Sequence, residues 1–394
     1  MNMISTYIRI GTSILILALL VLSCNEKRKN NSTKDETIVT TESRPTGKWS
    51  VERANAWYNQ LDWLVGCNFV PSNAINQLEM WQKDTFSPEL IDKELEWAEN
   101  LGFNTLRVFL HYLPWKEDKV GFYNRVDDFL DICEKHNIRV MLIFFDDVWH
   151  PYPESGLQPE PTKGVHNSGW VQSPGITILK DLAPHEASLK NYVQETIERY
   201  AEDSRVLIWD LYNEPANPNQ ASYGEIELEA KMDYSLVLLR KVFEWAREIN
   251  PSQPICSDVW RAGNLDLTKL DAIDEFCYEN SDVINFHSYY GPENTEKIVE
   301  MLSASGRPLL CTEYMARTAG STFETILPIF KKHKVAAYNW GLVNGKSNTI
   351  YPWSSWEHPF ANEPEIWFHD IFREDGEPFS KAEAQFIKSI IRQK

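Results

Sequence analysis

The sequence predicts an α/β fold, a closed (β/α)8 barrel, on the strength of three observations. Short apolar runs recur from Trp63 onward at a spacing of about 40 residues, which suits one strand and one helix per barrel repeat. Helical patterns separate most of these runs. The runs are apolar at nearly every position, which is typical of parallel strands covered on both faces. An open doubly wound sheet is the alternative, but no glycine-rich phosphate loop follows the first run.

Eight strands are expected, each a short run rich in β-branched or aromatic residues. They cover residues 64–70, 105–110, 139–145, 206–212, 254–259, 283–289, 309–314 and 336–342. The chain beyond its N-terminal segment, about 345 residues, is long enough for one large barrel domain. No repeat or second change in composition indicates another domain.

Helices are expected between the strands. The clearest covers residues 88–101, where Ser87 precedes the helix, Pro88 takes its first position and Gly102 ends it. The others cover residues 124–136, 186–201, 232–249, 296–303 and 323–332, with 381–391 as the final helix. The segment 267–280 has the weakest helical pattern.

Two long segments, 146–184 and 344–365, have no regular pattern. Loops of this length in a compact domain are usually functional, and in a barrel they would lie on the catalytic face. They carry Trp149, Trp170, Trp353 and Trp356. These rings would serve either as platforms for a ligand or as anchors that hold the loops down.

The first residues have the pattern of a secretory signal. A single charge, Arg9, precedes the apolar stretch 14–22, which is too short to span a membrane. Val21-Leu22-Ser23-Cys24 resembles a bacterial lipobox. We therefore expect residues 1–23 to be a lipoprotein signal peptide and Cys24 to carry the lipid. An ordinary signal peptide with an incidental cysteine is the alternative.

Residues 24–48 are polar and charged, with too few large apolar groups to fold. We expect a disordered tether there, leading to a folded domain of residues 49–394. This arrangement predicts a protein of the bacterial cell envelope, periplasmic or on the outer surface. Its only attachment to the membrane would be the lipid anchor at Cys24.

The chain is strongly acidic. It has 39 basic and 57 acidic residues, for a formal net charge of −18. This charge argues against nucleic acids and polyanionic ligands and leaves neutral ligands such as carbohydrates. We expect a monomer.

Besides Cys24, the chain has five cysteines with no metal-binding or scaffold spacing. They are Cys67, Cys133, Cys256, Cys277 and Cys311. Buried free thiols are the expectation, and one disulfide of unassigned pairing stays open.

Polar side chains gather at the ends of the expected strands. The most informative are Glu214, which ends the run VLIWDLYNE, and Glu313, which ends PLLCTE. The others are Arg107, His111, Asp146, Asp147, Asn213, Trp260, His287, Tyr289 and Trp340. Charged groups are rarely buried without partners, so their convergence on one end of a barrel indicates a functional site.

Several of these residues resemble those of the clan A glycoside hydrolases, and family 5, the cellulase and mannanase type of TIM barrel, is the nearest. Asn213-Glu214-Pro215 and Glu313 match the acid/base and the nucleophile of that family. Arg107 matches its arginine on the second strand, His287-Ser288-Tyr289 its His-x-Tyr motif on the sixth, and Trp340 its tryptophan on the eighth.

The resemblance extends over roughly residues 61–345, nearly the whole barrel. It departs from the family pattern at one point, within FFDDVWH, where Asp146-Asp147 replaces the histidine that usually follows the third strand. We therefore expect the subsite beside that strand to be built differently.

The resemblance implies a retaining hydrolase that cleaves a β-glycosidic bond in a neutral oligo- or polysaccharide by double displacement. Glu313 would attack the anomeric carbon, kept ionised by Arg107 and Tyr289. Glu214 would protonate the leaving oxygen and then activate water. Retention predicts carboxyl groups about 5–5.5 Å apart. No cofactor or metal is implied.

The same resemblance implies substrate contacts. Asn213 would bond the sugar 2-OH, and Trp340 would stack on an apolar sugar face. Further contacts are expected from Arg107, His287, Tyr289 and Trp149. Asp146 and Asp147, where the sequence departs from the family, are expected to contact the sugar, with Ca²⁺ binding or capping of the loop as the alternatives.

Two other functions stay open. A non-catalytic glycan-binding lipoprotein would use the same barrel without a working carboxylate pair. A metal-dependent hydrolase would use Asp146, Asp147, His150 and His166, whose spacing matches no common metal motif. The identity of the sugar, its linkage and the choice between endo and exo action are not determined by the sequence.

Overall fold

The fold was determined from a computed structural model, and the structure describes residues 47–261, 263 and 266–393. The described residues all belong to one compact unit. The expected signal peptide, Cys24 and all but the last two residues of the expected tether lie outside the described residues. Within the described ranges, no helix combines the length and the apolar composition that a membrane crossing requires.

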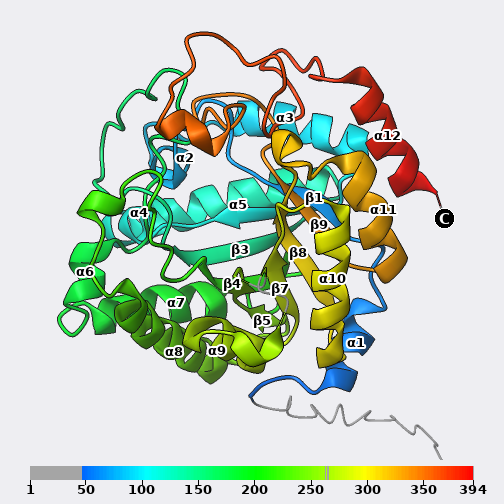
Figure 1. Cartoon of the computed structure of the whole chain (residues 1–394). Helices are drawn as coiled ribbons and strands as arrows, with labels where there is room; N and C mark the ends of the chain where they lie inside the picture. Colours follow the sequence, from blue (N-terminus) through cyan, green and yellow to red (C-terminus); the bar gives the residue numbers. More distant parts are fainter. Residues whose placement is uncertain (1–46, 262, 264–265, 394) are drawn as a thin grey trace, which may run out of the picture. The chain divides into compact units, whose positions relative to one another are not determined.

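The chain forms the parallel barrel that the sequence predicts (Figure 1). The strands are β1 (Val65–Asn68), β2 (Thr105–Phe109), β3 (Arg139–Asp146), β4 (Val206–Asn213), β5 (Ile255–Cys256), β6 (Asp258–Val259), β7 (Ile284–His287), β8 (Leu309–Tyr314) and β9 (Ala336–Trp340). All pairings between them are parallel, and β1 lies between β2 and β9.

The ring closes through the expected fifth strand, which is interrupted once. β5 pairs with β4, and β6 pairs with β7, with Ser257 between the two short segments. Ser257 itself is not part of either strand segment, and its side-chain hydroxyl donates to the carbonyl of Tyr212 at 2.7 Å. The nine strand segments therefore occupy eight positions of a barrel.

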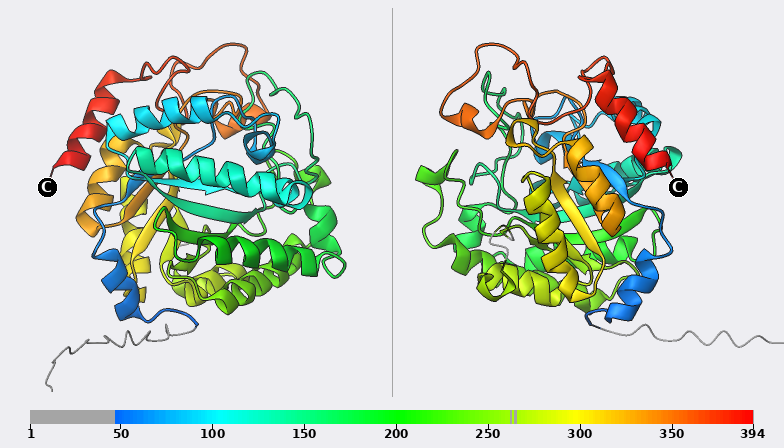
Figure 2. Two further views of the ribbon diagram at one scale, coloured as in Figure 1. Left: turned by 180° about the vertical axis from the view of Figure 1, so that it is seen from behind. Right: turned by 45° about the vertical axis from the view of Figure 1, so that its right-hand side comes forward.

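Helices surround the strands (Figures 1 and 2). They are α3 (Pro88–Leu101), α5 (Lys119–Lys135), α7 (Glu186–Tyr200), α8 (Lys231–Ile249), α9 (Ala272–Asn280), α10 (Pro292–Leu302), α11 (Phe323–His333) and α12 (Lys381–Arg392). The expected bounds agree to within one residue at both ends of most of these helices, and α3 ends at Gly102 with φ 96° as predicted.

Two helices begin earlier than the sequence pattern indicates. α5 begins at Lys119 because the Asp118 carboxylate accepts from the Gly121 backbone N–H at 3.1 Å and caps the helix. α10 begins at Pro292, which takes the first helical position. The weak pattern over 267–280 contains α9, capped by the Asp271 side chain.

The amino end of the barrel is covered by α1 (Val51–Tyr58). Trp57, Tyr58 and Leu61 pack against buried side chains from the starts of the strands, which fill the barrel interior. The backbone of Trp49 is fixed on both sides, because its N–H donates to Asp282 at 2.7 Å and its carbonyl accepts from Arg307 at 2.8 Å.

Three long loops lie at the carboxyl end of the barrel. The β1 loop (69–87) contains α2 (Gln77–Trp81), the β3 loop (147–185) contains α6 (Ile176–Lys180), and the β9 loop (341–380) contains a short 3-10 helix (Trp353–Trp356). A further short helix, α4 (Tyr112–Glu117), follows β2. All five cysteines of the described chain are buried and unpaired.

Candidate active site

Arg107, on β2, is the centre of the polar network at the carboxyl end of the barrel. Its side chain is completely buried, and its Nε and Nη2 donate to one Asp210 oxygen at 2.9 and 2.7 Å. Its Nη1 donates to Glu313 at 3.0 Å, and its Nη2 donates to Asn213 at 2.8 Å. Burial lowers the pKa of Arg107, but the neighbouring carboxylates Asp210 and Glu313 outweigh it and raise the pKa overall.

Glu313, on β8, accepts from two donors. The Arg107 Nη1 lies at 3.0 Å from Oε1, and the Tyr289 hydroxyl donates to Oε2 at 2.8 Å. Burial raises the pKa of Glu313, and the contacts with Arg107 and Tyr289 oppose that rise. The two contacts fix the orientation of this carboxylate and favour its ionised form, while burial keeps its pKa above the ordinary value.

Glu214 follows β4 directly and has a left-handed backbone conformation, with φ 41°. Non-glycine residues in this region are strained, and such strain is concentrated at functional sites. Burial raises the pKa of Glu214, and its one amide donor, Asn217 Nδ2 at 2.5 Å from Oε2, lowers it. Unlike Glu313, Glu214 forms no ion pair with any arginine that the structure describes.

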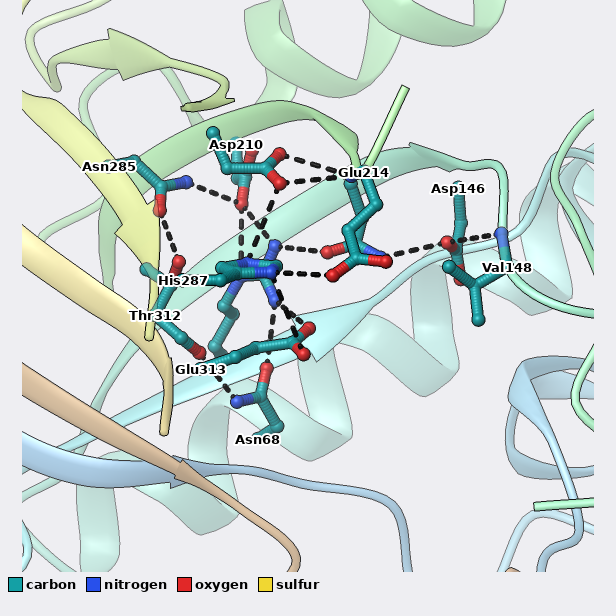
Figure 3. A network of polar contacts seen from close by, with 12 residues as sticks. Asn68, Asp146, Val148, Asp210, Glu214, Asn285, His287, Thr312 and Glu313 are labelled. Carbon is teal, nitrogen blue, oxygen red and sulfur yellow. Dashed lines mark hydrogen bonds and ion pairs between the residues drawn. The ribbon is translucent and has the colours of Figure 1, made fainter. Parts of the chain in front are cut away.

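His287, at the end of β7, lies between the two glutamates, as Figure 3 shows. Its Nδ1 is 2.8 Å from Glu214 Oε1 and 3.7 Å from Glu313 Oε2. Burial lowers the pKa of His287 to about 3, so the ring is neutral. Its Nε2 is buried without a hydrogen-bond partner, 3.6 Å from Asp258.

Asn213 is held through both ends of its side-chain amide. Its Oδ1 accepts from Arg107, and its Nδ2 donates to Asp146 Oδ1 at 2.9 Å. The other Asp146 oxygen accepts from Trp170 Nε1 at 2.7 Å and from Gln77 Nε2 at 3.1 Å. Asp146 thus fixes which way the Asn213 amide faces.

The two aspartates that replace the expected histidine lie behind the site. Asp146 and Asp147 are each 1 % exposed and do not line the cavity. Asp147 accepts from the Tyr212 hydroxyl at 2.9 Å, the Ala216 backbone at 2.6 Å and the Ser235 hydroxyl at 2.6 Å. Their placement differs from the sugar contacts expected from the sequence, because internal donors take up their oxygens.

Both glutamates open into one cavity of about 610 Å³, a volume that suits a small ligand. Of the expected site residues, Asn213, Glu214, Trp260, His287, Tyr289, Glu313, Trp340 and Trp149 line it. Arg107 lies below it, completely buried. His111 is also buried outside the cavity wall, where its Nε2 lies 3.0 Å from the carbonyl of Gln172.

Some of the loop tryptophans line the cavity, and one packs against another loop. Trp149, Trp170 and Trp353 line the cavity, whereas Trp356 packs against Tyr223 with ring centroids 5.1 Å apart. Trp340 contacts Trp170 edge-to-face at 5.6 Å. The cavity wall is therefore strongly aromatic and offers large, flat apolar surfaces to a ligand.

Several site residues were not identified from the sequence. Asp210, within β4, and Asp258, the first residue of β6, are both buried, and Asp210 could have been noticed as an isolated carboxylate that needs a cationic partner such as Arg107. His369 and Asn217 line the cavity from loops. No local pattern marks those two, because only the folded loops bring them to the wall.

The metal-binding set that the sequence left open is not assembled. Among the described residues, the grouping that could hold an ion consists of Glu214, His287 and Glu313, whose ligand atoms lie within 4.8 Å of one another. Asp146, Asp147, His150 and His166 form no such group. One oxygen of Glu214 thus lies within 4.8 Å of one oxygen of Glu313, so the two carboxyl groups face the same small space.

A parallel barrel with two adjacent glutamates in an aromatic cavity is typical of glycoside hydrolases. The family model for cellulase, glycosyl hydrolase family 5, matches residues 69–357. The chain therefore belongs to glycosyl hydrolase family 5, as its motifs indicated. A comparison with curated protein sequences finds no significant match.

Solved structures share the fold at low identity. A GH5_18 protein from Streptomyces cattleya in complex with GlcNAc is 16 % identical with TM-score 0.56, over 84 % of this chain and 80 % of that chain. A broad-specificity GH5-4 endoglucanase from Clostridium longisporum is 11 % identical with TM-score 0.56, over 86 % and 98 %. An exo-β-1,4-mannosidase from Opitutaceae bacterium strain TAV5 is 18 % identical with TM-score 0.51, over 84 % and 59 %.

Proposed function

We propose that this glycoside hydrolase cleaves a β-glycosidic bond in a neutral oligo- or polysaccharide with net retention, using Glu313 as nucleophile and Glu214 as acid/base. The observation that carries the proposal is the unequal setting of two adjacent glutamates. Glu313 contacts the Arg107 guanidinium and the Tyr289 hydroxyl, whereas Glu214 contacts neither. When the pair holds one proton, that proton belongs on Glu214.

The first step is glycosylation of the enzyme. A Glu313 oxygen bonds to the anomeric carbon as the bond to the leaving oxygen breaks, and that oxygen takes the proton of Glu214. In the second step, Glu214 removes a proton from water, the water oxygen bonds to the anomeric carbon, and Glu313 is released as a carboxylate. The net reaction consumes one water, and two displacements restore the original anomeric configuration.

Fixed neighbours support each group. Asn213, oriented by Asp146 and Arg107, faces the cavity and can bond the sugar 2-OH, a contact that strengthens in the transition state. Trp340 offers its ring to an apolar sugar face. The neutral His287 contacts Glu214 at 2.8 Å and lies 3.7 Å from Glu313 without adding charge.

The test uses 2-deoxy-2-fluoro β-glycosides with a good leaving group, which trap a covalent glycosyl-enzyme. We expect stoichiometric inactivation, a mass increase of one sugar on the peptide that contains Glu313, and none in Glu313→Ala. Proton NMR of an active substrate should show the β-anomer first. An α-anomer formed first would overturn the retaining mechanism.

We also propose that residues 1–23 are removed and that Cys24 carries a lipid anchor. The proposal rests on the Val21–Cys24 motif that follows a short apolar stretch. Metabolic labelling with palmitate should mark the wild-type protein. Labelling of Cys24→Ser at the same level would refute the anchor.

A further inference from the structure

We infer that the enzyme removes a single sugar from the non-reducing end of its glycan and does not cleave within a chain. This inference rests on the proposed function and adds the mode of attack. It follows from one asymmetry of the cavity, which is closed on the side that would hold the chain beyond the cleaved sugar.

The two sides of the cavity follow from the chemistry. The acid/base protonates the leaving oxygen, so the reducing-end part of the substrate lies toward Glu214 and the strands near it. Glu214 follows β4, and Trp340 ends β9, which lies four positions away in the eight-position ring, directly opposite. The sugar attacked by Glu313 therefore has its non-reducing end directed toward Trp340 and the loops around it.

A wall of aromatic rings closes this second side. Trp170 and Trp340 contact each other at 5.6 Å, and Phe109 packs against both, at 5.0 and 5.8 Å. Behind Trp170 and Trp340 the free space is about 10 Å³. That volume holds about one water molecule and no second sugar.

Three loops cross over the closed side and are bound to one another. Hydrogen bonds join the β3 loop to the β9 loop, and further hydrogen bonds join the β1 loop to both of them. The backbone links are Asn167 N–H to the Ser347 carbonyl at 2.9 Å, Phe360 N–H to the Gly164 carbonyl at 3.0 Å and Lys346 N–H to the Ser72 carbonyl at 2.9 Å. Side-chain links are His166 N–H to the Ser355 hydroxyl at 2.9 Å and Asn76 Nδ2 to the Gly169 carbonyl at 2.8 Å.

Glycines lie where these loops approach most closely. A Cβ on Gly164 would lie 1.8 Å from the Phe360 carbonyl oxygen, and one on Gly345 would lie 2.1 Å from that of Ser72. A Cβ on Gly169 would lie 2.2 Å from Ile75. The contacts between the loops are thus tight at three separate places, and the wall is a packed structure.

The opposite side of the cavity is open. It is lined by Asn217, Trp260 and Tyr290, from the loops after β4, β6 and β7, and by Asn294, from the first turn of α10. Tyr290 is 48 % exposed, and Asn294 is also exposed. By contrast, His166, Asn167 and Trp170 on the closed side are each at most 2 % exposed. A substrate can therefore extend only beyond its leaving group.

The closed side carries acceptors for the hydroxyls of a terminal sugar. The Nδ1 atoms of His166 and His369 lie 2.8 and 2.5 Å from the carbonyls of Tyr351 and Met315. A carbonyl only accepts, so each Nδ1 carries the proton and each Nε2 has a lone pair. Both residues line the cavity, where these lone pairs can accept from sugar hydroxyls. Burial lowers the pKa of both rings, to about 4 for His166.

The test is product analysis with the full-length protein. The probes are aryl β-mannosides and β-glucosides, reducing-end-labelled β-1,4-manno- and gluco-oligosaccharides, and the same oligosaccharides with a 4,6-O-benzylidene group on the non-reducing sugar. We expect the labelled chains to shorten by one sugar at a time and the capped chains to stay intact. Early products that lack two or more sugars, or cleavage of capped chains, would overturn the inference.

Failure of the proposed function gives a different pattern. In that case no uncapped probe is hydrolysed and no fluoroglycoside labels Glu313, and the inference falls with the function. A hydrolase with internal cleavage still labels Glu313 and still cuts uncapped chains, so the two failures are distinguishable.

A pair of variants at Trp170 tests the wall itself. Trp170→Ala removes the ring, and Trp170→Phe keeps a ring but removes the N–H that donates to Asp146. We expect Trp170→Ala to cleave the capped oligosaccharides at least 10-fold faster than the wild-type protein, while Trp170→Phe leaves them intact. Equal behaviour of the two variants would show that the ring does not close the site.

Discussion

Asn213 illustrates how neighbouring side chains fix the orientation of a single residue in this site. One amide has to face Arg107 with its oxygen and Asp146 with its nitrogen, and the two partners leave no second orientation. The sequence identified Asn213, Glu214, Glu313, Arg107 and Tyr289 as a group, and the structure brings them together. The role of Asp146 in orienting Asn213 could not be read from the sequence. It depends on Trp170 and Gln77, which reach the Asp146 carboxylate from distant loops.

The amide of Asn217 should set the alkaline limb of activity. It donates to Glu214 and favours the ionised form, so Asn217→Ala should raise the pKa of Glu214 further above its ordinary value. A general acid must be protonated, so activity should persist to higher pH. We expect the alkaline limb of the kcat/KM profile to move upward with the acid limb unchanged. A downward shift would contradict the assigned role.

Tyr289 should set the acid limb of the pH dependence of kcat/KM. Its hydroxyl lowers the pKa of Glu313, so Tyr289→Phe should raise that pKa, and protonation should disable the nucleophile at higher pH than in the wild-type protein. We expect the acid limb of kcat/KM to shift upward and kcat to fall. Asn217→Ala is the matched comparison, and a shift of the same limb in both variants would refute the division of roles.

At the scale of elements, the strands and most helices follow from hydrophobic pattern and capping residues. Where the observed bounds of a helix or strand differ from the expected ones, a single local interaction accounts for the difference. Asp118 extends α5 by capping it, and Ser257 interrupts the fifth strand by bonding to Tyr212. The loops could be recognised as functional from their length, but their mutual contacts join residues as distant as Ser72 and Lys346, which no local pattern indicates.

The glycine contacts between loops should be sensitive to a single methyl group. Gly345→Ala places a Cβ 2.1 Å from a backbone oxygen, so the two loops must separate. Overpacking of this kind costs about 1–3 kcal/mol. We expect a lower Tm and faster proteolysis within the β9 loop. Gly291→Ala is the control, because its nearest neighbour would be at 3.8 Å and its φ is ordinary. Equal losses in the two variants would contradict the tight contact.

At the scale of the whole molecule, the barrel has a covered amino end and an active carboxyl end. Trp57 and Tyr58 of α1, together with Leu61, cover the interior at the end where no ligand is expected. Strand count, period and chain length sufficed to predict this closed architecture. They could not predict which long loop would cover which part of the opposite end, since that depends on tertiary packing.

Two N-terminal truncations should distinguish the residues before Gly47, which we expect the folded domain not to need, from α1, which stabilises the barrel. A chain that begins at Gly47 keeps α1 and should retain the Tm and kcat/KM of the full-length protein. A chain that begins at Gln60 loses α1 and Trp49, which is 4 % exposed, and should lose about 3–5 kcal/mol of stability, the cost of deleting a buried aromatic residue. Thermal unfolding monitored by circular dichroism measures both. An unchanged Tm in the shorter chain would refute the covering role of α1.

The close approach of three loops at Gly164, Gly169 and Gly345 also constrains how this enzyme can be redesigned. Exchanging or lengthening one loop alone would leave its partners with clashes or unmatched backbone groups. The β1, β3 and β9 loops therefore constitute one exchangeable module, and a change of specificity transplanted from a relative would have to bring all three together.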